Sequence, residues 1–255
     1  MSKAAKFHSL ANRSVLITGG ASGIGKALVE AFARQGAKTA FLDLDVSAGE
    51  KLQDSLREET GSTVVFGNCD LKDIDALQKS IVALAEETGA FEVLVNNAAN
   101  DTRHDWRDVT PEYWDDRVAV NLRHYFFAIQ AVAPGMIEAG GGSIINLGSV
   151  SWMLAQGGMP CYTTSKSAVQ GLTRSFARDL GPHGIRVNTL VPGWVMTERQ
   201  LELWVDEAGE RTMDEQMCLK GRVKPHDIAN AALFFAADES AMCSAQSLIV
   251  DGGWV

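Results

Sequence analysis

The sequence predicts an α/β fold in which a doubly wound parallel sheet of seven strands carries helices on both faces. Short apolar runs alternate along the chain with segments of helical periodicity, which is the order that builds parallel sheets. The runs are continuously apolar and do not alternate with polar residues, and this indicates strands buried on both faces. No linker, repeat or low-complexity segment interrupts the pattern, so residues 1–255 are predicted to form a single domain.

The first strand is expected at residues 14–20, where the apolar run SVLITGG ends in two glycines. A helical segment at 23–35 follows it and leads into the second apolar run, KTAFLDLD, at 38–45. The same two patterns predict helices at 47–59 and 73–88 and strands at 63–70 and 91–99.

In the second half, a long helix is expected at residues 111–139, before the apolar run GSIINLGS at 142–149. The remaining predicted elements are helices at 161–180, 199–219 and 226–237 and strands at 184–193 and 247–250. The stretch from about residue 192 to 222 is expected to be the mobile loop over a substrate.

The composition is that of a soluble globular protein, with 46% hydrophobic and 22% charged residues among 255. The chain has 23 Lys and Arg against 32 Asp and Glu, a net charge of −9, and no basic block. Binding to nucleic acid or to an anionic membrane is therefore disfavoured. The N-terminus lacks the apolar stretch of a signal peptide, and no segment approaches the ~20 apolar residues of a membrane span. A cytoplasmic protein is expected.

The cysteines and histidines indicate no metal site. No cysteine pair has CxxC spacing, so neither a zinc site nor a redox dithiol is predicted, and reduced, buried thiols are expected. No two histidines show the spacing of metal ligands. The residues concerned are Cys69, Cys161, Cys218, Cys243, His8, His124, His183 and His226.

A glycine-rich turn after the first strand predicts a dinucleotide site. It reads TGGASGIG from Thr18 to Gly25, directly before the first helix. Glycines allow a tight turn and let the backbone approach a pyrophosphate at the helix N-terminus. The cofactor-binding residues expected from this turn are Gly19, Ser22, Gly23, Ile24 and Gly25.

An acidic residue at the end of the second strand favours NAD over NADP. The Asp43 carboxylate can accept both hydrogen bonds of an adenosine ribose diol and would repel a 2′-phosphate. No Arg or Lys stands in the following Leu44-Asp45-Val46. The alternative is that Asp43 only caps the loop. Asp70 and Leu71 are expected near the adenine, although Asp70 is also a natural N-cap for the next helix.

The residues become specific when they are taken together. TGGASGIG, Asn96-Asn97-Ala98-Ala99, Asn121, Ser149, Tyr162-x₃-Lys166 and Pro192-Gly193 occur in order, with Ser149 thirteen residues before Tyr162. In this set the chain resembles the short-chain dehydrogenase/reductase family from Ser14 to Val255, which implies a Rossmann-type sheet and a nicotinamide cofactor. The family's NNAG is NNAA here, and Ala99 fits unless its φ is positive.

The resemblance implies catalytic roles for four residues. Tyr162 is expected to exchange a proton with the substrate while hydride passes between substrate and cofactor. Lys166, four residues later on a helix, lies on the same face, and its ammonium together with the positive ring of an oxidised nicotinamide is expected to lower the pKa of Tyr162. Bringing that pKa from ~10 to ~7 takes about 4 kcal/mol of preferential phenolate stabilisation. Ser149 is expected to hydrogen-bond the reacting oxygen, with Ser151 as a less well-spaced rival. Asn121 is expected to hold a water linked to Lys166, or else to be a helix-kink residue.

The resemblance also implies further cofactor contacts. Lys166 and Tyr162 are expected beside the nicotinamide ribose. The other expected contacts are Asn97 and Ala98 near the cofactor's ribose and Pro192, Gly193, Val195 and Thr197 around the nicotinamide carboxamide.

The substrate is expected between residues 100–105, residues 152–159 and the stretch after Pro192. These segments offer hydrogen-bond donors, acceptors and indole faces, which suit a compact polyhydroxylated ligand. For each residue a purely structural role, such as lid packing by a tryptophan or pairing of an arginine with a neighbouring acid, is an equal alternative. Besides Ser149 and Tyr162, the candidates are Asn100, Arg103, Trp152, Gln156, Trp194 and Arg199.

Three segments narrow the resemblance to bacterial aldose 1-dehydrogenases of the family: NNAANDTRHDW, AVNLRHYFF and VDGGW. This implies oxidation of the anomeric hydroxyl of an aldose, such as D-xylose, L-arabinose, D-galactose, L-fucose or L-rhamnose, to a lactone. No metal is needed for that hydride transfer. A homotetramer is expected from the family, with contacts through the helices at 111–139 and 161–180, and the C-terminal residues Gly252–Val255 could reach a neighbouring subunit's site.

Three alternatives stay open. The first is a 3-oxoacyl-thioester reductase using NADPH, which Asp43 and the net charge disfavour. The second is an S-adenosylmethionine methyltransferase, which has no use for Tyr162 and Lys166. The third is a non-catalytic dinucleotide-binding protein, which typically lacks the tyrosine.

Overall fold

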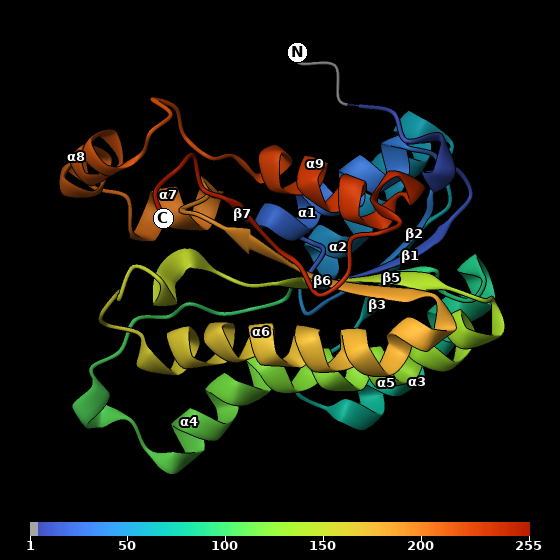
Figure 1. The fold of residues 1–255 in the computed structure, drawn as a ribbon, viewed down its shortest axis with the longest axis horizontal. Helices are drawn as coiled ribbons and strands as arrows, with labels where there is room; N and C mark the ends of the chain where they lie inside the picture. Colours follow the sequence, from blue (N-terminus) through green and yellow to red (C-terminus); the bar gives the residue numbers. More distant parts are fainter. Residues whose placement is uncertain (1–4) are drawn as a thin grey trace.

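The computed structural model describes residues 5–255 (Figure 1). Its strands are β1 (Ser14–Thr18), β2 (Lys38–Asp43), β3 (Val64–Asn68), β4 (Val93–Asn96), β5 (Gly142–Leu147), β6 (Ile185–Pro192) and β7 (Ser247–Val250). The α-helices of this part of the chain are α1 (Gly23–Arg34), α2 (Val46–Thr60), α3 (Ile74–Thr88), α4 (Pro111–Val118), α5 (His124–Glu138), α6 (Pro160–Leu180), α7 (Glu198–Leu203), α8 (Glu207–Gln216) and α9 (Pro225–Ala236).

All seven strands run parallel in the order β3-β2-β1-β4-β5-β6-β7, which confirms the predicted sheet. Strand β1 pairs with both β2 and β4, so the chain first builds the sheet outward on one side and then on the other. The loops that leave β1 and β4 therefore diverge at the carboxyl ends of neighbouring strands. Open α/β sheets bind their ligands in the crevice at such a point.

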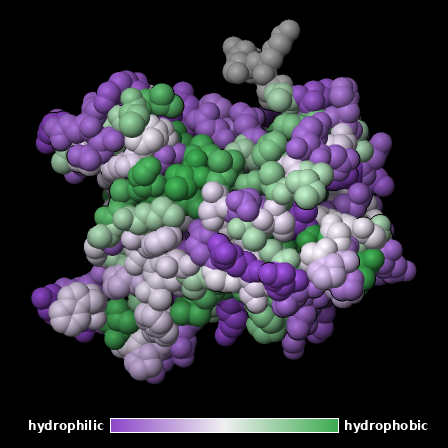
Figure 2. Space-filling model, in the orientation of Figure 1, coloured by the Kyte–Doolittle hydropathy of each residue, from purple (hydrophilic) through white to green (hydrophobic). Residues whose placement is uncertain are grey.

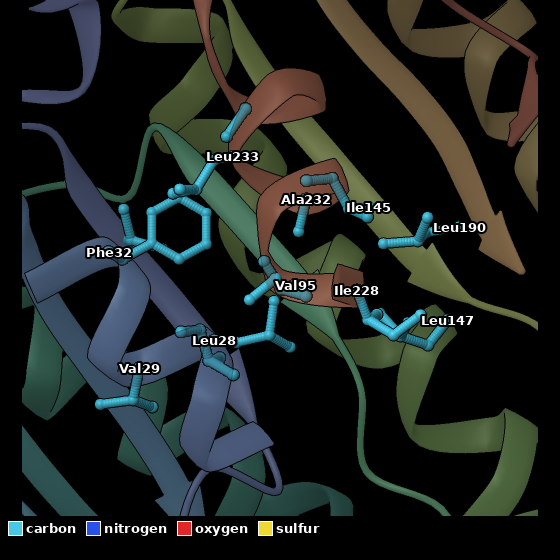
Figure 3. Packing of buried hydrophobic residues seen from close by; sticks show 14 of the residues in the cluster. Leu28, Val29, Phe32, Val95, Ile145, Leu147, Leu190, Ile228, Ala232 and Leu233 are labelled. Carbon is cyan, nitrogen blue, oxygen red and sulfur yellow. The ribbon is translucent and has the colours of Figure 1, made fainter. Parts of the chain in front are cut away.

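Helices cover both faces of the sheet (Figure 1). On one face, α1 and α9 pack against each other and α2 lies beside them; on the other face lie α3, α5 and α6. In the first layer, Leu28 and Phe32 of α1 meet Leu233 of α9 above Val95 of β4 (Figure 3). Each of these four side chains is at most 1% exposed. The continuous apolar strands thus have partners on both faces, as predicted from the sequence.

The helix predicted at 111–139 is confirmed in its extent, because residues 111–138 are helical without a break, but it is not a regular α-helix throughout. The chain forms α4, then a π-helical turn at Ala119–Arg123, then α5. A π-turn inserts an extra residue into the helical path and is frequent at functional sites. Periodicity alone does not reveal it, because the apolar pattern continues on either side.

The helix predicted at 199–219 is also two helices. Helix α7 ends before Trp204, and Asp206 starts α8 by accepting a hydrogen bond from the Gly209 amide at 2.8 Å. A new N-cap of this kind stabilises a separate helix start. Residues 192–222 accordingly contain two short helices, and the mobility of this stretch over a substrate stays a prediction.

Within residues 5–255, no helix is long and apolar enough to cross a membrane. The same residues contain no group of three or more His, Cys, Asp or Glu side chains arranged to hold a metal ion. All four cysteines are free thiols there: Cys69 and Cys161 are buried and Cys218 is exposed.

Replacing Phe32 by Ala should lower the free energy of unfolding by about 3–5 kcal/mol, because the ring is completely buried between α1 and α9. Urea denaturation followed by circular dichroism measures the change. Val82→Ala on α3, where the side chain is 62% exposed, is the matched control and should change the stability by less than about 0.5 kcal/mol. Equal effects of the two substitutions would contradict this packing.

Candidate active site

A cavity of about 1190 Å³ opens at the carboxyl ends of the strands. The segments that follow β1, β2, β3, β4, β5 and β6 all contribute to its wall, together with α6, α7 and the C-terminal Trp254. Helix α8 lies at the same end of the molecule, where hydrophobic residues gather below its hydrophilic outer surface (Figure 2). The cavity is therefore the crevice that the strand order predicts.

Most residues singled out from the sequence lie on this cavity. From the predicted catalytic set, Ser149, Tyr162 and Lys166 line it. The predicted cofactor residues in its wall are Gly19, Ser22, Gly23, Ile24, Gly25, Asp43, Asp70, Leu71, Asn97, Ala98, Pro192, Gly193, Val195 and Thr197. The predicted substrate residues in its wall are Asn100, Arg103, Gln156, Trp194 and Arg199.

The glycine turn forms a close backbone cradle. Gly19 has φ +67°, and a Cβ at this position would lie 2.8 Å from the Cα of Ala98. A Cβ at Gly25 would lie 1.7 Å from the carbonyl oxygen of Gly19. The Asn97 side chain secures the turn from β4 by donating to the carbonyls of Thr18 and Gly19 at 3.0 and 2.9 Å. Side chains are thus excluded where a dinucleotide backbone needs room.

The first turn of α1 leaves its amides available to the cavity. Its N-cap, Ser22, makes no side-chain capping bond within the described residues, whereas α2 and α3 are capped by Asp45 and Asp73. Free amides at a helix N-terminus attract anionic groups. The residues present therefore fit the pyrophosphate of a dinucleotide.

The Asp43 carboxylate is held in place by two backbone amides. Its Oδ2 accepts from the Ala21 amide at 2.9 Å and its Oδ1 from the Asp45 amide at 3.1 Å. The loop-capping alternative is thus part of what this carboxylate does, and each oxygen keeps a lone pair for a further donor. Asp70 is not the N-cap of α3, because Asp73 occupies that position.

Tyr162 and Lys166 lie one turn apart on α6, with the Lys166 Nζ 5.8 Å from the centre of the Tyr162 ring. Desolvation of the phenol raises the pKa of Tyr162 to about 12, and the negative charge of Asp101 adds to this. A hydrogen bond with Ser149 and the positive charge of Arg103 act in the opposite direction. The protein's residues alone hold the pKa of Tyr162 above its usual value, and the lowering expected from the ammonium together with an oxidised nicotinamide stays a prediction.

Lys166 is an almost fully buried amine, 1% exposed, at the inner wall of the cavity. Its Nζ donates to the hydroxyl of Tyr125 and to the carbonyl of Leu147, both at 2.9 Å. The Tyr125 hydroxyl in turn donates to the same carbonyl at 3.2 Å. Burial lowers the pKa of Lys166 to about 7. The ammonium form depends on these two oxygen acceptors.

Sequence reasoning missed Tyr125. It lies in AVNLRHYFF, four residues after Asn121. The surrounding helix is largely apolar, so the sequence pattern indicates only an aromatic residue of the core. Its one polar atom is the signal, because a buried tyrosine hydroxyl needs a hydrogen-bond partner. Burial raises the pKa of Tyr125 well above its usual value, so this hydroxyl stays protonated.

Asn121 is fully buried in the π-turn and does not line the cavity. Its Oδ1 accepts from the Asn100 amide at 2.8 Å, and its Nδ2 donates to the Asn100 carbonyl at 3.2 Å. Its position in the π-turn agrees with the alternative prediction that Asn121 is a helix-kink residue. Its link to a water and to Lys166 stays a prediction.

Trp152 is a correction to the predicted substrate residues. It is 36% exposed at the end of the turn Val150–Trp152, and it lines a separate shallow depression beside Thr163 and Thr164 of α6. The prediction placed residues 152–159 around the substrate. From this stretch, Leu154, Gln156 and Met159 line the cavity, whereas Trp152 lines only the depression.

The C-terminal residues are held by Asp251, and their reach to a neighbouring subunit stays a prediction. The Asp251 carboxylate accepts hydrogen bonds from the amides of Gly253, Trp254 and Val255 at 2.8–3.1 Å. This folds Trp254 against Trp194, with 6.4 Å between the ring centres, and into the cavity of its own chain.

The comparisons with known proteins agree on one family. A family model described as Enoyl-(Acyl carrier protein) reductase matches residues 19–255. The chain is 45% identical to the "Probable galactose dehydrogenase GalD" of Rhizobium meliloti over 97% of both chains. It is 45% identical to the D-xylose 1-dehydrogenase of Caulobacter vibrioides over 97% of this chain and 98% of that one. A solved double mutant of a Serratia marcescens short-chain dehydrogenase/reductase superposes with a TM-score of 0.89 at 32% identity, covering 97% of this chain and 99% of that one.

Replacing Tyr125 by Phe should lower the pKa of Lys166 below about 7, because the ammonium keeps its burial but loses one of two acceptors. One hydrogen bond to a charged group corresponds to a shift of about one pKa unit or more. NMR titration of lysine labelled at Cε measures it. Tyr113→Phe on α4, where the hydroxyl contacts His104 instead, is the control. An unchanged pKa of Lys166 in Tyr125→Phe would show that the contact does not support the charge.

Proposed function

Because the chain belongs to the short-chain dehydrogenase/reductase family, we propose that it is a sugar dehydrogenase that oxidises the C1 hydroxyl of an aldose to the aldonolactone. The observation that carries the proposal is the convergence of Ser149, Tyr162 and Lys166 on the cavity into which the glycine turn opens. The 45% identity to two enzymes named as sugar dehydrogenases supports the substrate class. The balanced reaction is aldose + NAD⁺ → aldonolactone + NADH + H⁺.

Tyr162 is the proposed base. A bound oxidised nicotinamide would supply the hydride acceptor and, until hydride transfer, a positive charge in the cavity. Tyr162 Oη takes the proton of the C1 hydroxyl, and the Ser149 hydroxyl donates to the same substrate oxygen. Moving the pKa of Tyr162 from about 12 to ~7 corresponds to about 7 kcal/mol of preferential phenolate stabilisation.

Lys166 is proposed to supply a second positive charge close to this phenol. Two of its N–H bonds are directed to Tyr125 and Leu147, so a third remains for the hydroxyls of the nicotinamide ribose. Acceptors there would stabilise the ammonium and raise its pKa from about 7. Cofactor binding and phenolate formation are then coupled. Binding stabilises the Lys166 ammonium, and the ammonium in turn stabilises the Tyr162 phenolate.

NAD is the proposed cofactor. Asp43 lines the cavity at the end of β2, and the neighbouring Leu44 is an exposed apolar residue, 63% accessible. A fixed carboxylate accepts the two hydroxyls of a ribose diol and repels a 2′-phosphate. Ser22 in the glycine turn also brings no positive charge to this region.

The sugar fits the polar character of the outer cavity. Arg103 lies over the Trp204 ring at 5.0 Å and contacts the sulfur of Met159, so the guanidinium stands in the cavity wall without an acidic partner of its own among the described residues. Polar groups held in place reject a substrate with a mismatched hydroxyl more sharply than an apolar wall does. The second candidate is a 3-oxoacyl-thioester reductase, whose acyl-thioester substrate class is also that of the enoyl reductases that the matching family model is described by.

We also propose a homotetramer working in the cytoplasm. Apolar side chains are exposed on α5 at Phe126, 43% accessible, and on the edge strand β7 at Leu248 and Ile249, both 37% accessible. Exposed edge strands and apolar helix faces are surfaces that associate. Sedimentation equilibrium measures the assembly.

The wild-type protein should reduce NAD⁺ with at least one aldose from a panel of pentoses, hexoses and 6-deoxyhexoses. Tyr162→Phe should lower kcat by about a thousandfold, because the base is lost, while the Kd of NAD⁺ rises at most about tenfold, because at most one hydrogen bond to the ribose is lost. The rate of NADH formation at 340 nm measures kcat, and fluorescence titration measures the Kd. The matched control, Tyr113→Phe, should retain wild-type turnover. Reduction of a 3-oxoacyl thioester with NADPH, without turnover of any aldose, would favour the second candidate.

Asp43→Asn should reduce the preference for NAD⁺ over NADP⁺ by at least about tenfold, because the 2′-phosphate no longer meets a negative charge. Kd values for both cofactors from fluorescence titration measure the ratio. Asp45→Asn, two residues later, removes an equal charge but keeps a residue suited to capping α2. Identical ratios in the two variants would show that Asp43 does not select the cofactor.

A further inference from the structure

The cavity holds an acidic side chain that the proposed chemistry does not use. Asp101 follows Asn100 in the segment after β4 and lines the cavity, with its side chain only 18% exposed. A carboxylate with so little access to water needs donors around it. The role of Asp101 depends on its donors in the protein and on the further hydrogen bonds that its carboxylate can accept.

The backbone at Asp101 is fixed from both sides. Asn121 clamps the Asn100 backbone through two hydrogen bonds, of 2.8 and 3.2 Å. The Asn100 side-chain oxygen accepts from the Thr102 amide at 3.0 Å and from Arg117 at 2.9 Å. The π-turn that buries Asn121 therefore sets the position of Asp101.

Two side chains of α7 donate to the Asp101 carboxylate, one to each oxygen. Gln200 Nε2 donates to Oδ2 at 2.7 Å, and Arg199 Nε lies 3.4 Å from Oδ1. The side-chain oxygen Oε1 of Gln200 accepts from the indole Nε1 of Trp194 at 2.9 Å. Asp101, Gln200 and Trp194 thus form one hydrogen-bonded chain, and all three line the cavity.

This chain lies close to the reacting phenol. The negative charge of Asp101 raises the pKa of Tyr162, whereas the positive charge of Arg103, two residues later in the chain, lowers it. Asp101, Arg103 and Tyr162 line the same cavity, so a substrate whose hydroxyl meets Tyr162 Oη shares that cavity with this segment.

An ionised carboxylate has about four lone-pair positions. Gln200 and Arg199 occupy two of them, and the others are open to donors in the cavity. Sugar ring hydroxyls are such donors, and a carboxylate can accept from two neighbouring hydroxyls at once. An acyl chain offers no donor to this position.

We propose that Asp101, oriented by Gln200 and Trp194, is the acceptor that recognises ring hydroxyls of the sugar and so determines which aldose is oxidised. The proposal rests on the proposed function, whose substrate it specifies further. The competing role for Asp101 is mechanical, since Arg199 and Gln200 also attach α7 to the segment after β4.

The test combines Asp101→Asn with deoxy sugars. Asparagine keeps the shape and one oxygen for Gln200, but it loses the charge and one acceptor. The aldose that the wild-type protein oxidises best is compared with its derivatives lacking the hydroxyl at C2, C3 or C4. Asp105→Asn, on the same segment but paired with Arg107 outside the cavity, is the matched control. The Kd of NAD⁺ and thermal melting are recorded for each variant to monitor the fold.

Asp101→Asn should lower kcat/KM for the intact aldose by about tenfold to a hundredfold, the effect of losing hydrogen bonds to a charged group. The loss should shrink to less than about threefold for the deoxy sugar that lacks the recognised hydroxyl, as in a double-mutant cycle. Asp105→Asn should leave all four kcat/KM values unchanged.

Two outcomes would overturn the proposal in distinguishable ways. An equal loss for the intact aldose and for every deoxy derivative would assign Asp101 the mechanical role alone, with the sugar dehydrogenase intact. Absence of turnover of any aldose by the wild-type protein would overturn the proposed function and this subsite with it.

Discussion

A sheet whose seven strands are all parallel, with helices on both faces, leaves its carboxyl edge as the place where polar side chains can gather. The faces are taken up by apolar packing, as the fully buried Phe32 and Leu94 on opposite sides show. At the edge, the order reversal between β1 and β4 opens the crevice. The glycine turn, Asp43, Asn97 and Ser149 all follow strands that end there. Everything proposed about function depends on this geometry.

The second organising feature is a pair of titratable groups driven toward their neutral forms by burial. The pKa of Tyr162 is raised to about 12 and that of Lys166 is lowered to about 7. Neutral forms are what a buried site prefers when charges lack partners. Tyr125 and the Leu147 carbonyl keep an ammonium possible at Lys166. A ligand that brings a positive charge and hydroxyl acceptors shifts both groups toward the ion pair, so the site is poised to ionise on binding.

The π-turn at Ala119–Arg123 connects the scaffold to the substrate side of the cavity. It buries Asn121 against the Asn100 backbone, and the segment after β4 then reaches α7 through Asp101 and Trp204 through Arg103. One kink inside the helical layer thus controls the position of groups that lie close to Tyr162. Asn121 therefore affects the cavity although it does not line it, because it fixes the backbone of the segment that does.

The sequence alone determined the sheet, its seven strands and about half of the residues that line the cavity, from the glycine turn to Tyr162 and Lys166. These features depend on local patterns, such as apolar runs, glycines before a helix and a four-residue spacing, which can be recognised in a single amino-acid sequence. Only the tertiary structure decided what depends on direction and partnership. It divided the helices predicted at 111–139 and 199–219, turned Trp152 out of the cavity, and brought Tyr125 and Asp101 to Lys166 and Gln200. Those contacts join residues 41 and 99 positions apart, and no local pattern encodes which distant side chains will share a hydrogen bond.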